Sequence, residues 1–103
     1  MIKGTTPTLL YNLPFEATNI KSAEIVLEYT DANKSVKIVK GFEDCTLEGT
    51  TISAVLTQEE TLQIPAPTTV YVQLRVLTTD GIALATEVEG VTVKRLLKED
   101  VIE

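Results

Sequence analysis

The sequence predicts an all-β protein, an immunoglobulin-like antiparallel β-sandwich of about seven or eight short strands with one short helical turn near residues 57–61. Three observations support this. Several segments alternate between apolar and polar residues with a period of two, and turn-forming residues recur between them. Threonine is abundant, and its β-branched side chain suits a pleated surface. The third is size, because 103 residues, 44% of them hydrophobic, suffice for one core.

The first expected strand is bracketed by Pro7 and Pro14, which cannot donate to an interior ladder. Between them, apolar side chains recur at Leu9, Tyr11 and Leu13. A second strand has Ala23, Ile25, Leu27 and Tyr29 on its inward face.

The segment 31–34 supplies turn residues after that strand, since Asp and Asn tolerate unusual backbone dihedrals. A hairpin partner is expected over 35–40, with Val36 and Ile38 facing the core. Another strand follows the turn-prone segment 48–50 and directs Ile52, Ala54 and Leu56 inward.

Thr57 and Glu60 match the capping-box pattern, which predicts the helical turn. A brief strand is expected over 62–64, and Pro65 and Pro67 stiffen the corner after it.

The sharpest alternation of the chain predicts a central strand over 70–77. Its inward face is expected to carry Val70, Val72, Leu74 and Val76, and its outward face Tyr71, Gln73 and Arg75. Asp80-Gly81 predicts a hairpin turn. The return strand is expected over 82–88, with a bulge or bend at Gly90 and a continuation over 91–94.

These elements form one domain over residues 1–95, followed by a C-terminal tail over 96–103. Leu96, Leu97 and Val101 recur at spacings that allow a short amphipathic helix in the tail. Because so short a helix is unstable alone, the tail has to fray, dock on its own domain or dock on a neighbouring subunit.

The net charge is −6 and the pI is about 4.6. Binding to nucleic acid through phosphates requires clustered Lys and Arg, so nucleic acids and anionic membranes are not expected as partners. No run of about 18 apolar residues is present and the first residues do not form a signal peptide. We therefore expect the chain to be made and kept in the cytoplasm, unless an assembly carries it out.

The types of residue present give little support for a catalytic site. The chain has no His, which excludes a Ser/His/Asp triad and His-containing metal sites. Paired carboxylates such as Glu59 and Glu60 are adjacent in sequence, and neighbours do not face each other across a cleft. The single Cys45 is interpreted as a half-buried structural residue. No enzyme activity, metal or cofactor is expected.

Two groups of residues are candidates for protein contacts. Tyr71 and Arg75 lie on the outward face of the central strand, where Tyr71 can serve either as a contact or as a cross-strand packing partner. The second group is Leu96, Leu97 and Val101 in the tail. A carbohydrate- or cell-surface-binding module is the alternative function, and it requires a rim of exposed aromatics drawn from Tyr71, Tyr29 and Phe42.

The second half of the chain resembles one known family. Its segments 56–61 (LTQEET), 70–76 (VYVQLRV), Asp80-Gly81 and 91–93 (VTV) follow one another as in the N-terminal immunoglobulin-like domain of phage baseplate upper proteins. The opening segments 4–8 and 13–15 also resemble small proteins encoded among the structural genes of prophages in Gram-positive bacteria.

This resemblance implies a non-enzymatic phage or prophage structural protein, associated with the tail or baseplate and acting through protein–protein contacts. Its partners would be other phage structural proteins or further copies of itself. The long segments that follow the domain in baseplate upper proteins are not found in this sequence, which favours a small adaptor over a host-recognition protein.

Overall fold

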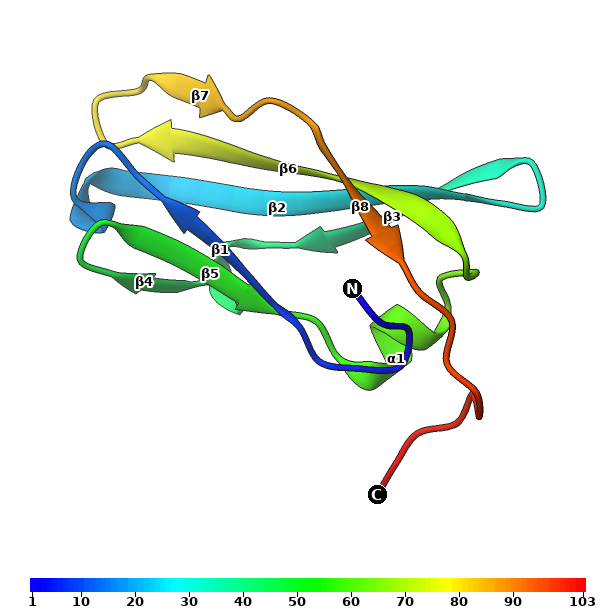
Figure 1. Cartoon of the computed structure of the whole chain (residues 1–103). Coiled ribbons are helices and arrows are strands. Elements are labelled where there is room, and N and C mark those ends of the chain that lie inside the picture. Colours follow the sequence, from blue (N-terminus) through cyan, green and yellow to red (C-terminus); the bar gives the residue numbers. More distant parts are fainter.

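Two antiparallel sheets packed face to face make up the protein, as the computed structural model of residues 1–103 shows (Figure 1). The smaller sheet has the order β1-β5-β4, formed by Thr8–Asn12, Thr51–Val55 and Thr46–Glu48. The larger sheet has the order β3-β2-β6-β7, with β8 also pairing with β6. Its strands are β2 (Ile20–Asp31), β3 (Lys34–Lys40), β6 (Thr68–Thr78), β7 (Ala83–Ala85) and β8 (Glu89–Val93). The predicted all-β sandwich is confirmed.

The strand order is that of an immunoglobulin-like sandwich. In such sandwiches one sheet contains strands B, E and D, and the other can contain C′, C, F and G. When β1 is equated with B, the smaller sheet reads B-E-D and the larger reads C′-C-F-G, with β7 and β8 sharing the place of G. Both sheets are built from antiparallel pairs.

The core lies between the sheets and follows the predicted alternation. On β2 and β6 the ladder places Ile25 opposite Leu74 and Leu27 opposite Val72, so the apolar faces of both strands point to the same side. Ile52, Ala54 and Leu56 enter from the smaller sheet and are at most 2% exposed. The inward residues predicted for β2, β5 and β6 are all buried.

The predicted turns also form. Ala32 and Asn33 join β2 to β3 with φ of 50° and 65°, and Asp31 lies opposite Lys34 at the start of the ladder. After β6, the Thr78 N–H donates to the Ile82 carbonyl at 2.9 Å, and Gly81 has φ of 83°. A positive φ carries no steric cost at glycine, which is why Asp80-Gly81 predicts this hairpin correctly.

The return strand was predicted as nearly continuous, and this is wrong. It is divided into β7 and β8, with the break at 86–88. The Thr86 hydroxyl accepts the Leu74 N–H at 3.0 Å in place of a ladder carbonyl, so the chain leaves the sheet here. Gly90 is paired within β8, opposite Tyr71. The short strand β4 was not predicted because three residues show no alternation.

The helical turn is confirmed as α1 (Gln58–Leu62), preceded by the Thr57 capping box. Two short 3-10 turns, Ala17–Asn19 and Phe42–Asp44, complete the secondary structure. The brief strand predicted over 62–64 is wrong. Leu62 ends the helix, and the Ile64 N–H donates to the Thr61 carbonyl at 3.2 Å, so this segment is a turn that buries Ile64.

The short helix considered for the tail 96–103 is also wrong, because these residues adopt bends and irregular backbone. The Ile102 backbone instead bonds both ways with the Gln58 side chain, at 2.9 and 3.1 Å. An eight-residue segment gains too few helical bonds to offset the cost of nucleation, and it takes the backbone partners that its own domain offers.

We predict that Thr57→Ala lowers the free energy of unfolding by about 1 kcal/mol, because the Thr57 hydroxyl accepts the Glu60 N–H at 3.1 Å. Thr57→Ser keeps the hydroxyl and is the matched control. Urea denaturation of both variants measures the difference. Equal stability of the Thr57→Ala and Thr57→Ser variants would show that the cap contributes nothing.

Candidate functional site

The five residues predicted to make contacts occupy two separate regions. Tyr71 and Arg75 project from the outer face of β6, in register with Glu28 and Glu24 of β2. Leu96, Leu97 and Val101 lie in the tail, which is held by the N-terminal segment and α1. Tyr71 and Arg75 therefore share one face of β6, and the other three residues share the tail, but the structure does not join the two groups into one surface.

Tyr71 packs across the sheet on Gly90. A Cβ atom placed on Gly90 would lie 3.5 Å from Tyr71 Cε1, so the ring covers the open space beside this glycine. Such pairing of an aromatic ring with a glycine near a sheet edge supports the ladder. The ring remains 50% exposed, so one side of it faces solvent.

The charges around Tyr71 are paired. Arg75 Nη1 lies 3.0 Å from Glu24 Oε1. On the neighbouring strands, Lys37 Nζ lies 3.5 Å from Glu28 Oε2. These pairs are exposed, so each contributes little to stability, but together they leave the outer face of the larger sheet close to neutral.

The three aromatics that a sugar-binding rim would need are not grouped. Tyr29 is 3% exposed and belongs to the core between the sheets. Phe42 is half-buried against that core, and only Tyr71 projects from a sheet face. Burial raises the Tyr29 pKa, and the charge of Asp31 raises it further.

The tail docks on its own domain at several points. Leu96 is half-buried and lies beside Gly4 and Leu62, so close that a Cβ on Gly4 would meet it at 2.6 Å. Lys3 pairs with Glu99. Between these anchors Leu97 is 90% exposed, the largest value among the exposed large hydrophobic residues, whereas Val101 is 37% exposed.

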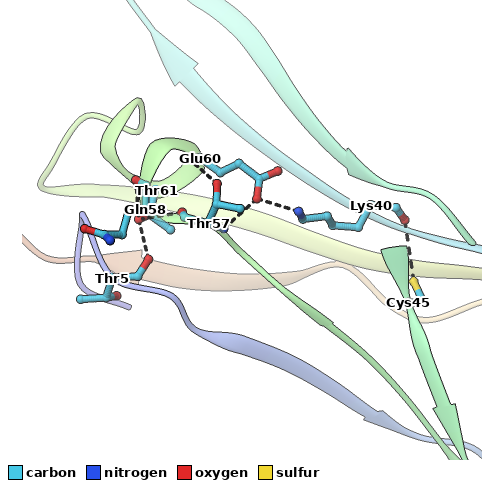
Figure 2. A network of polar contacts seen from close by, with 7 residues as sticks. All are labelled: Thr5, Lys40, Cys45, Thr57, Gln58, Glu60 and Thr61. Carbon is cyan, nitrogen blue, oxygen red and sulfur yellow. Dashed lines mark hydrogen bonds and ion pairs between the residues drawn. The ribbon is translucent and has the colours of Figure 1, made fainter. Parts of the chain in front are cut away.

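A polar network ties β3, α1 and the N-terminal segment together (Figure 2). Lys40 Nζ lies 2.7 Å from Glu60 Oε1, which also accepts the Thr57 N–H at 2.8 Å. The Thr61 hydroxyl donates to the Thr5 carbonyl at 2.8 Å and is fully buried. Lys40 was missed as a structural residue, although its position two residues after the inward Ile38 signals that it faces the core.

The pKa values of two side chains in this region, Glu60 and Cys45, are shifted. For Glu60, burial raises the pKa, but hydrogen bonds from Lys40 and the Thr57 N–H, with the Lys40 charge, outweigh it and the pKa is lowered. For Cys45, burial and then the charges of Asp44 and Glu43 raise the pKa of the thiol, and Lys40 opposes them. The Cys45 Sγ donates to the Gly41 carbonyl at 3.3 Å, as befits the structural role predicted for it.

No group of three or more His, Cys, Asp or Glu side chains is placed to hold a metal ion. None of the helices has the length and hydropathy needed to span a membrane. No family model, characterised protein or solved structure matches this chain.

We predict that Glu60→Gln lowers the free energy of unfolding by about 2 kcal/mol at pH 7, because the buried Lys40 ammonium loses its counter-charge. Glutamine preserves the capping box, so the loss reports the ion pair alone. In the double variant Lys40→Met, Glu60→Gln part of the stability returns, since no unpaired charge remains buried.

The Lys40–Glu60 pair also makes the free energy of unfolding depend on pH in the acid range. Because the folded-state pKa of Glu60 is lowered, its contribution is complete at neutral pH and is lost as the pH falls through that pKa. The difference between the wild type and Glu60→Gln therefore shrinks between about pH 5 and pH 3 in denaturation experiments. A difference that is independent of pH contradicts this assignment.

We predict that Tyr71→Ala lowers the free energy of unfolding by about 1 kcal/mol and that Tyr71→Phe has almost no effect, because the ring and not the hydroxyl covers Gly90. Arg75→Ala, on the same face, is the control and should stay within about 0.5 kcal/mol of the wild type. Thermal denaturation of the three variants tests this. If Tyr71→Ala is as stable as the wild type, the ring does not support the sheet, and only a role in contacts remains for it.

Proposed function

We propose that this protein is a non-enzymatic structural or assembly protein of a phage or prophage, associated with the tail or baseplate and acting through protein–protein contacts. The sequence resemblance to the immunoglobulin-like domain of baseplate upper proteins supports the phage role. Its segments correspond to the capped helix α1, strand β6, the Asp80-Gly81 turn and strand β8.

Contact through surfaces is supported by one observation in particular, the open strand edges flanked by exposed apolar residues. The larger sheet ends at β3 on one side and at β7 and β8 on the other. Beside the second edge, Ile82, Leu84 and Val88 are 46–58% exposed. Unpaired strand edges and exposed apolar side chains are features that interfaces use.

The acidic composition agrees with such a role. A net charge of −6 keeps free subunits apart and in solution, and it favours partners that present basic patches. Opposite charge also accelerates encounter, so assembly of such a subunit should slow as salt is added.

We predict that the chain is a component of purified phage particles, or of tails and baseplates released from them, when its source prophage is induced. Quantitative mass spectrometry of gradient-purified particles measures its copy number relative to the major tail protein. An abundant host cytoplasmic protein serves as the control for carry-over. Enrichment no greater than that of the control, in particles and in tail intermediates alike, contradicts the proposal.

A further inference from the structure

A narrow apolar cleft opens at the edge of the sandwich, between the loop that follows β1 and strand β7. Its volume is about 200 Å³. We call it the slot, and its apolar walls are Leu13, Phe15, Leu74, Val76 and Leu84. An apolar cavity of about 150 Å³ can hold a benzene molecule, so the slot has room for one leucine side chain.

The slot is exposed because the sandwich is incompletely covered at this edge. Leu84 lies opposite Val76, whose side chain is only 6% exposed, and yet Leu84 itself is 46% exposed. Strand β7 pairs with β6 alone, so its other edge is free. Leu84 thus occupies a core-facing register position and remains half exposed, so its side chain is available for contact with an apolar group that enters the slot.

Acidic residues adjoin two walls of the slot in sequence. Glu16 and Glu87 follow its two walls directly in sequence and are both exposed, and segments 12–16 and 82–89 contain no Lys or Arg. A third acidic residue, Glu89, lies near Tyr11, which directly precedes the slot residue Asn12. The pKa of Tyr11 is raised, first by burial and then by the negative charge of Glu89. The slot therefore favours an apolar side chain flanked by basic residues.

One segment of this chain has that chemistry. Leu97 is 90% exposed and lies between Arg95 and Lys98, in the densest cluster of basic residues outside strand β3. We call Leu97 with Arg95 and Lys98 the knob. Lys98 lies 3.3 Å from Asp100, but this pair is exposed and weak, so it does not remove Lys98 from other contacts.

The knob is held away from its own domain. Leu96 is seated beside Gly4 on one side of it, and the Ile102 backbone is bonded to Gln58 on the other. Because the chain is held on both sides of the knob, at Leu96 and at Ile102, its backbone loses less conformational entropy on binding than a free tail would.

Leu97 cannot reach the slot of its own molecule. The slot residue Leu84 and the strand end Val93 lie opposite Val76 and Thr68 of β6, eight positions apart or about 26 Å along the strand. From Val93 to Leu97 the chain extends at most about 14 Å. Figure 1 likewise shows β7 and the C-terminus at opposite sides of the molecule.

We propose that the knob of one copy inserts into the slot of a second copy, so that the protein associates head to tail. This inference rests on the proposed function, for which it names a second copy of the chain as a partner. The two surfaces differ, so the contact is heterologous and leaves a free knob at one end and a free slot at the other. Repetition of such a contact produces a ring or an open filament.

Analytical ultracentrifugation over a wide concentration range tests the proposal. The mean mass of the wild type should rise with concentration, and Leu97→Asp should weaken association by roughly tenfold or more. Leu84→Asp, in the slot, should do the same. Leu10→Asp is the matched control, because Leu10 is 60% exposed on the outer face of the smaller sheet, and it should associate like the wild type.

Mixing the two defective variants gives the sharpest result. Leu97→Asp and Leu84→Asp should each associate weakly alone, but an equimolar mixture retains one intact knob and one intact slot and should form mainly a heterodimer. Should Leu84→Asp melt at a lower temperature than the wild type, Glu87→Lys replaces it, since Glu87 is exposed and its reversal repels the basic knob.

A wild type that stays monomeric at every concentration overturns the knob-and-slot proposal, as does a Leu97→Asp variant that associates normally or a mixture that gives no heterodimer. None of these results changes the prediction for phage particles. Conversely, a chain that associates through Leu97 but is absent from particles contradicts the proposed function alone.

Discussion

The ladder between β2 and β6 is the interaction on which the rest of the structure depends. It aligns Ile25 with Leu74 and Leu27 with Val72, so that two long strands present one continuous apolar face to the smaller sheet. A shift of one residue would turn every one of these side chains toward solvent. Strand β3 on one side and β7 and β8 on the other take their register from this central pair.

The same ladder orders the outer face, where it pairs Glu24 with Arg75. On this face, which is close to neutral, Tyr71 packs against Gly90. Surfaces better suited to contact lie where the ladder ends. At the open edge of β7 the slot remains uncovered, and beyond β8 the tail holds Leu97 in solvent.

At the other end of the sandwich, the Lys40–Glu60 pair joins the larger sheet to the capped helix. Thr61 then fixes the N-terminal segment through Thr5, and Gln58 fixes the tail through Ile102. One short helix therefore anchors both ends of the chain. These polar contacts hold the tail in an irregular conformation. Leu97 is exposed because it lies between Leu96, which packs beside Gly4, and Ile102, which is bonded to Gln58.

The sequence by itself determined the strands with strong alternation, the turns at Asn33 and Gly81 and the capping box, because each depends on residues that are neighbours in the chain. Only the tertiary structure decided the rest. The break at Thr86, the burial of Lys40 and the path of the tail depend on Leu74, Glu60 and Gln58, which are distant in sequence. The slot is likewise formed by the loop after β1 together with β6 and β7, so no local pattern could have revealed it.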